Sequence, residues 1–119
     1  TTTSKGGRDR PDFVMMHVGR SVEIVEIKRP EHQLTNEEFE RLRGYINALD
    51  KFMKANPALK EEFPAVHATL ICDELKLGET PRLAFEKLKD DRRLERKTWW
   101  EILADVEKVN RDFLNAHRP

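Results

Sequence analysis

The chain has 119 residues and a mass of 14.0 kDa, which suffices for one compact domain and is too little for two independent hydrophobic cores. Charged residues make up 37% of it, the mean hydropathy is -0.74, and no apolar run approaches the roughly 18 residues of a membrane span, so we expect no membrane-embedded part. The 22 basic and 22 acidic residues cancel, so contact with nucleic acid would need a local basic patch. Cys72 is the single cysteine, which excludes a disulfide within the chain and a CxxC zinc site and favours a cytoplasmic protein.

The first ten residues, 1–10, are polar and follow neither the strand period nor the helix period, which predicts a flexible lead-in. The chain starts at Thr1 and not at Met, so we expect it to be excised from a longer protein that has further domains. Residues 11–119 are predicted to form a single domain.

Two apolar segments near the start predict a β-hairpin. Residues 13–16 are continuously apolar, residues 22–28 are rich in β-branched side chains, and Gly19-Arg20 offers a turn between them. These features predict two antiparallel strands.

A long amphipathic helix and a buried strand are predicted next. Thr35 and Glu38 form a capping box, and apolar residues recur at spacings of three and four through 35–53. The almost unbroken apolar run 65–72 is typical of a strand covered on both faces. The order strand, helix, strand predicts a right-handed crossover to a parallel strand.

Two further helices are predicted in the last third of the chain. Pro81 lies where the first turn of one would begin, and a short extended piece follows at 93–97. Thr98 and Glu101 form a second capping box, which starts the final helix. Its apolar stripe consists of Ile102, Val106, Val109 and Phe113. The sequence therefore predicts an α/β domain with a small mixed sheet, made of the hairpin and the parallel strand, flanked by helices.

Polar residues within the apolar strands are the candidates for chemistry: Asp12 opens the first strand, and Glu26 and Lys28 interrupt the second. Alternation places Glu26 and Lys28 on one face and Ile27 on the other. Asp12 joins them only if it faces residue 26 or 28 across the hairpin. A two-residue loop would pair Asp12 with Ile27, whereas a three-residue loop or a bulge would pair it with Glu26 or Lys28. We predict the longer loop or the bulge.

Two converging carboxylates make a hard oxygen site suited to Mg²⁺ or Mn²⁺, so Asp12 and Glu26 are predicted metal ligands. The backbone carbonyl of Ile27 is a candidate third ligand. Such a metal lowers the pKa of bound water and neutralises charge on a phosphodiester. Lys28 would orient or help deprotonate that water and stabilise the developing negative charge.

The runs Arg10–Asp12 and Glu26–Lys28, followed by a helix and a buried strand, resemble the PD-(D/E)XK, or restriction-endonuclease-like, nuclease superfamily over residues 10–116. Many members carry Gln-x-x-x-Tyr on the next helix, bordering the active site; Arg41 and Tyr45 occupy the matching positions. Members usually place another acidic residue on a helix before the hairpin, and no such helix is expected here, so either that segment belongs to the longer protein or the site works with fewer ligands. The runs Glu26–Pro30 and Thr98–Leu103 are also similar to the nuclease domain of Shedu-type anti-phage defence proteins.

The resemblance implies a restriction-endonuclease-like core and a Mg²⁺-dependent endonuclease acting on DNA in anti-phage defence, with RNA not distinguished by the sequence. It implies that Asp12, Glu26, Lys28 and Tyr45 are catalytic and that Arg29 and Arg41 bind the phosphate backbone; an ordinary surface role stays open for both arginines. Nucleases that cut both strands often pair subunits by two-fold symmetry, so we expect a homo-oligomer. The alternatives are an inactive nucleic-acid-binding or oligomerisation module on the same scaffold, and a structural α/β module without nuclease ancestry.

Overall fold

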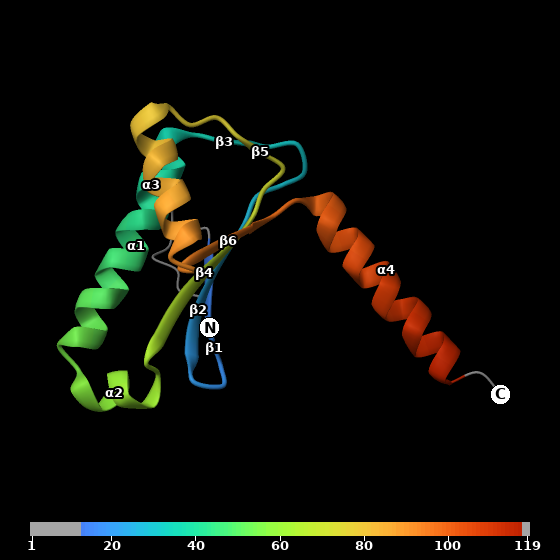
Figure 1. The fold of residues 1–119 in the computed structure, drawn as a ribbon, viewed down its shortest axis with the longest axis horizontal. Helices are drawn as coiled ribbons and strands as arrows, with labels where there is room; N and C mark the ends of the chain where they lie inside the picture. Colours follow the sequence, from blue (N-terminus) through green and yellow to red (C-terminus); the bar gives the residue numbers. More distant parts are fainter. Residues whose placement is uncertain (1–12, 118–119) are drawn as a thin grey trace, which may run out of the picture.

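A four-stranded mixed β-sheet forms the centre of the fold, and helices cover one of its faces (Figure 1). The structure is a computed structural model and describes residues 13–117. In chain order, its elements are β1 (Phe13–Val18), β2 (Ser21–Ile27), β3 (Gln33–Leu34), α1 (Asn36–Lys54), α2 (Pro57–Glu62), β4 (Ala65–Ile71), β5 (Glu74–Leu75), α3 (Glu79–Asp90), β6 (Leu94–Lys97) and α4 (Trp99–Ala116). The strand order is β1-β2-β4-β6, with β1 antiparallel to β2 and the other neighbours parallel. The predicted α/β fold with a small mixed sheet is confirmed.

Helices α1 and α3 pack on the same face of the sheet. Phe39 and Leu42 of α1 and Phe85 of α3 are buried against Ile24 of β2 and Leu70 of β4. The capping box predicted for α1 is present, because the Thr35 side chain accepts from the Glu38 N–H and the Glu38 carboxylate accepts from the Thr35 N–H. The apolar stripe of α1 thus faces the sheet as its spacing predicts.

The other face of the sheet is only partly covered. In β4, Val66, Ala68 and Leu70 are buried, whereas His67 and Thr69, which alternate with them, are half-buried. The prediction that this strand is covered on both faces is therefore wrong. A run of apolar residues indicates that a strand is central in its sheet, but it does not show that a second layer of helices is present.

The hairpin turns through two residues, Gly19 and Arg20, because Val18 pairs directly with Ser21. Gly19 has a φ of +59°, which the first position of a type II′ turn requires. The predicted three-residue loop or bulge is therefore wrong, and with it falls the register that would pair Asp12 with Glu26 or Lys28. Asp12 itself, like the predicted lead-in 1–10, lies outside the described residues.

Two small features were not predicted. The short helix α2 lies between α1 and β4, with Pro57 at its first position, and β3 pairs with β5 in a separate two-stranded sheet. Both are too short to produce a periodic signal in the sequence. Helix α3 begins at Glu79, so Pro81 lies within its first turn as predicted.

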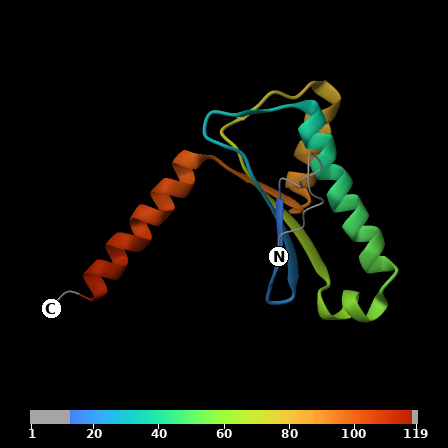
Figure 2. The same cartoon turned by 180° about the vertical axis from the view of Figure 1, so that it is seen from behind.

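Helix α4 extends away from the rest of the fold (Figures 1 and 2). Its predicted capping box is present, but none of its residues is buried, so the expectation that it flanks the sheet is wrong. The Cα radius of gyration is 16.6 Å, against about 13.5 Å for a compact domain of this length. Among the described helices, none has the length and apolar character needed to cross a membrane.

We expect Gly19→Ala and Gly44→Ala to change stability in opposite directions. Gly19 needs a positive φ, so an alanine there should lower the free energy of unfolding by about 1 kcal/mol. Gly44 lies in α1, where a Cβ would meet no atom within 4 Å, so alanine should raise the free energy of unfolding by up to about 1 kcal/mol. Urea denaturation measures both. A neutral or stabilising Gly19→Ala would contradict the two-residue turn.

Candidate functional site

Glu26 and Lys28 lie at the carboxyl end of β2 and share the helix-covered face of the sheet. Glu26 is 1% exposed and Lys28 is 8% exposed, and the Lys28 Nζ lies 3.6 Å from Glu26 Oε1. Ile27 between them points to the other face and is half exposed. The predicted alternation is therefore confirmed. Charged side chains are rarely buried without a partner of opposite charge, so this pair stands out chemically within an apolar layer.

Glu38 supplies a second carboxylate at the same place, although its position in the sequence predicts only a capping role. Its Oε2 lies 2.9 Å from Lys28 Nζ, and its Oε1 lies 2.8 Å from His32 Nε2. The same carboxylate closes the capping box of α1 through the Thr35 N–H. The start of α1 therefore brings Glu38 to the end of β2, where Lys28 contacts two carboxylates.

The pKa of Glu38 is well below its ordinary value of 4.5. Partial burial acts to raise this pKa, but the hydrogen bond from Lys28, and further ones from the Thr35 N–H and from His32, outweigh that effect and lower it to about 2. Glu38 is consequently ionised throughout the physiological pH range and is a permanent anionic neighbour of Lys28.

The loop after β4 and the first turn of α4 fix the backbone around Lys28. Trp99 Nε1 donates to the Lys28 carbonyl at 2.6 Å, and the Lys28 N–H donates to the Ile71 carbonyl at 2.9 Å. The Asp73 carboxylate accepts from the N–H of Glu31 at 2.7 Å and from the N–H of Trp99 at 2.8 Å. Both hydrogen bonds lower the pKa of Asp73, the one from Glu31 more than the one from Trp99. Asp73 was not predicted, because it lies in a short loop without a motif.

Cys72 and Arg96 complete this frame. The buried Cys72 thiol donates to the carbonyls of His32 and Glu74, and burial raises its pKa. Arg96 of β6 donates to the carbonyls of Cys72 and Asp73. The loops that follow β2 and β4 are thus tied together, as expected where the carboxyl ends of parallel strands meet.

The remaining predicted site residues that the structure describes lie on α1 and directly after β2. Tyr45 is half-buried in α1 and packs on the Phe13 ring, with the ring centroids 4.3 Å apart. Arg41 and Arg29 are exposed, on α1 and directly after Lys28 respectively. The structure therefore brings together Glu26 and Lys28, adds Glu38 and His32, and leaves the arginines at the surface.

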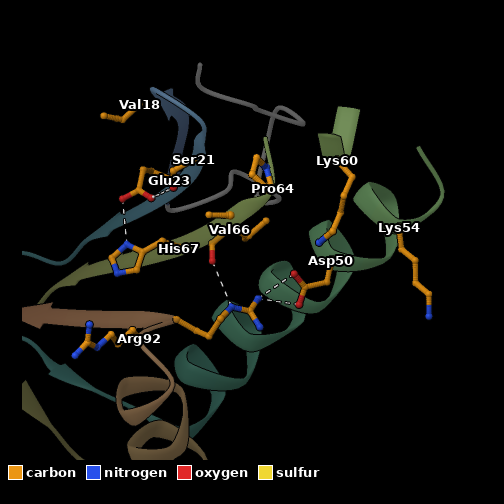
Figure 3. A pocket seen from close by; sticks show the side chains of 12 residues that line it. Val18, Ser21, Glu23, Asp50, Lys54, Lys60, Pro64, Val66, His67 and Arg92 are labelled. Carbon is orange, nitrogen blue, oxygen red and sulfur yellow. Dashed lines mark hydrogen bonds and ion pairs between the residues drawn. The ribbon is translucent and has the colours of Figure 1, made fainter. Parts of the chain in front are cut away.

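A wide pocket of about 1000 Å³ lies at the opposite end of the sheet, where β2 and β4 begin (Figure 3). Four of its polar side chains contact one another in pairs. His67 Nδ1 lies 3.0 Å from Glu23 Oε1, and Arg93 Nη2 donates to the Asp50 carboxylate at 2.9 Å. These pairs connect β4 to β2 and α1 to the segment before β6, so we assign them a structural role.

Comparison of the chain with protein-family models, with curated proteins and with solved structures finds no match.

The cluster suits a hydrated divalent cation. Within residues 13–117 no group of three or more His, Cys, Asp or Glu side chains is placed to hold a metal ion. Mg²⁺, however, keeps several waters and is commonly held by only one or two carboxylates together with substrate phosphates. Glu26 and Glu38 provide two carboxylates that already contact one cationic atom, Lys28 Nζ. The charge and the donor type of the described residues therefore fit such an ion.

The low pKa of Glu38 gives a test of the cluster at acid pH. Because this pKa is lower in the folded chain than in the unfolded one, the stabilisation is complete above about pH 5 and is lost as pH falls toward 2. Glu38→Gln keeps a capping-box residue but cannot ionise. Between pH 7 and pH 3, we expect the free energy of unfolding to fall by about 2 kcal/mol less in this variant than in the wild type.

Urea denaturation at the two pH values measures this difference. Glu37→Gln is the matched control, because Glu37 is an exposed carboxylate in the same helical turn. An equal pH dependence in the wild type and in Glu38→Gln would show that Lys28 and His32 do not hold Glu38 in the ionised form.

Proposed function

We propose that this chain is a metal-dependent nuclease domain of the PD-(D/E)XK type that hydrolyses phosphodiester bonds of DNA. The observation that carries the proposal is the contact of Lys28 Nζ with both Glu26 and Glu38 at the carboxyl end of β2. An acid, a lysine two residues later and a second acid from the following helix are the groups that such chemistry needs: oxygen ligands for a hard cation and a fixed positive charge beside them.

Glu26 would hold the metal, and Glu38 would share it or balance the charge of Lys28. When bound, Mg²⁺ would lower the pKa of a coordinated water and neutralise charge on the phosphate. Lys28 would donate to the attacking water or to a phosphate oxygen and stabilise the negative charge that develops there. The carbonyl of Ile27 stays a predicted further ligand, and Tyr45 stays a predicted group at the border of the site. The proposal does not rely on Asp12, because the observed hairpin register pairs Phe13 with Glu26 and so removes the argument that placed Asp12 beside Glu26.

The surroundings of the cluster support a substrate with an extended anionic backbone. Arg29 is exposed directly after Lys28, and Arg41 is exposed on α1. Exposed arginines can hold neighbouring phosphates in two-pronged hydrogen bonds while the Lys28 cluster acts on one phosphate. We therefore keep both as phosphate-binding residues of the proposed nuclease.

A role in anti-phage defence is part of the proposal. It is supported by the two runs similar to Shedu-type nuclease domains, 26–30 and 98–103, since Trp99 of the second donates to the Lys28 carbonyl of the first. Segments that are distant in sequence but similar to one family thus meet at the proposed site.

Manganese binding tests the metal site directly. We expect Mn²⁺ to bind the chain and Glu26→Gln to weaken binding at least tenfold, on the order of the loss that follows removal of a group supporting a metal site. Glutamine has nearly the same shape as glutamate, and Glu38 remains as a partner for Lys28 in this variant. Electron paramagnetic resonance of free Mn²⁺ measures the affinity, with Glu37→Gln as the control for removal of a carboxylate. Unchanged affinity in Glu26→Gln would contradict the site.

Lys28→Gln should separate metal binding from catalysis. Its side chain carries no charge to stabilise the transition state, so we expect plasmid nicking in Mg²⁺ to slow by at least about 100-fold while Mn²⁺ binding persists. Removing one partner of a buried ion pair also costs stability, so circular dichroism must show that the variant is folded at the assay temperature.

The same assay, with chelator as the reference, distinguishes the inactive-module alternative. Nicking by the wild type that survives chelator, or that is unchanged in Lys28→Gln, would contradict the mechanism. A wild type that binds Mn²⁺ and DNA without nicking would favour a binding module on this scaffold.

A further inference from the structure

Helix α4 carries a long apolar stripe that nothing in the described chain covers. Five of its large apolar side chains are 55–67% exposed, namely Leu103, Val106, Val109, Phe113 and Leu114, whereas Ile102 is half-buried. Trp100, which is 80% exposed, lies toward the other side of the helix, four residues before Ala104. The charges on its other side are paired along the helix, Lys108 with Asp112 at 2.7 Å and Arg111 with Glu107 at 3.3 Å. An amphipathic helix of this kind is stable when its apolar stripe packs against another layer.

Within residues 13–117, no helix packs on the second face of the sheet, which we call the uncovered face although its side chains are only partly exposed. Opposite the face packed by α1 and α3, the pairs Val14–Val25 and Ile27–Ile71 lie side by side across β1, β2 and β4. Val14, Val25 and Ile71 are half-buried and Ile27 is half exposed, without a helix over them. The 18 residues of α4 span about 27 Å, close to the roughly 23 Å length of the seven-residue strands β2 and β4. The helix and the sheet therefore match in length. The apolar part of this face lies toward the carboxyl ends of β2 and β4, and the hydrogen-bonded pair Glu23 and His67 lies on the same face nearer their starts.

Helix α4 is held away from its own sheet. Only Thr98 separates β6 from α4, and this residue is fixed by the capping box with Glu101. Trp99 is fixed through the Asp73 carboxylate and the Lys28 carbonyl. Folding α4 back onto its own sheet would break these hydrogen bonds. The direction in which α4 leaves the domain, seen in Figures 1 and 2, is therefore built into the fold.

We infer that two copies of this chain form a two-fold symmetric dimer in which α4 of each copy lies across the uncovered sheet face of the other. Each chain contains an apolar helix stripe and a sheet face that could pack together but do not meet within one copy. In a two-fold dimer, the helix of each copy can pack on the sheet of the other, so that the same contact forms twice. The exposed apolar side chains of α4 amount to on the order of 600 Å² per chain, at the upper end of what a monomer exposes. When both copies bury these side chains and the sheet surface that they cover, the total buried area reaches the roughly 1,600 Å² of a standard stable interface.

The charge of α4 disfavours an anionic lipid surface or nucleic acid as the occupant. Its charged residues are Glu101, Asp105, Glu107, Lys108, Arg111 and Asp112, so acids outnumber bases. Helices that bind anionic membranes present a basic polar face. A protein surface with exposed apolar side chains, such as the sheet face of a second copy, suits this helix better.

Analytical ultracentrifugation over a concentration series tests the dimer, and its readout is independent of any nuclease activity. We expect a dimer for the wild type, and dissociation constants raised at least about thirtyfold by Val109→Glu on the stripe and by Met16→Lys on the sheet face. Val109 is 67% exposed and Met16 is 41% exposed, and Met16 lies opposite Glu23, so both variants should keep the fold of the monomer. Ala104→Glu adds the same charge on the opposite side of α4 and should dimerise like the wild type.

Three results would overturn the inference. A wild type that stays monomeric throughout the series would mean that another molecule or segment covers the stripe. A dimer that survives Val109→Glu would not use α4. Loss of the dimer in Val109→Glu but not in Met16→Lys would indicate that two α4 helices pair with each other and leave the sheet faces uncovered.

Discussion

The ion pairs of Lys28 with Glu26 and Glu38 are the constraint on which the rest of the structure depends. Charged groups in a helix-covered face are costly unless each is matched, and here one ammonium group contacts two carboxylates. Replacing such a cluster by apolar side chains often costs nothing or even stabilises a protein. Its presence in an otherwise apolar layer is therefore poorly explained by stability and better explained by chemistry, which is the physical basis of the nuclease proposal.

Each segment that meets this cluster is fixed by a local rule. β2 delivers Glu26 and Lys28 because side chains alternate along a strand, and α1 delivers Glu38 because the third residue of a capping box turns back toward the helix start. The capping role and the ion pair use the same carboxylate, and this dual use accounts for its low pKa. The carboxylate that caps α1 thereby also belongs to a site whose residues come from distant parts of the sequence.

The sequence predicted the elements well where one physical signal was sufficient. Both capping boxes, the helix over 36–54 and the strand pairing β2-β4 follow from local hydrogen bonding and periodicity. The hairpin register did not follow, because Gly19-Arg20 is compatible with loops of different length, and only the observed pairing of Val18 with Ser21 distinguishes them. Glu38 was missed as a site residue because its capping role was a sufficient explanation of its position. The exposed stripe of α4 was expected to pack on its own sheet, because periodicity reveals that a face is apolar but not which molecule covers it.

Trp99 connects the proposed site to the proposed interface. Its indole donates to the carbonyl of Lys28, and its own N–H is held by Asp73, at the point where α4 starts. A partner that fixes the direction of α4 therefore also restrains the backbone that carries Lys28. A shift of α4 that broke the indole hydrogen bond would release one backbone anchor of this residue, which is also held through the Ile71 carbonyl. In a dimer with exchanged helices, the geometry of each cluster would thus depend on the sheet of the opposite copy, so assembly and chemistry would be coupled through a single side chain although each can be tested alone.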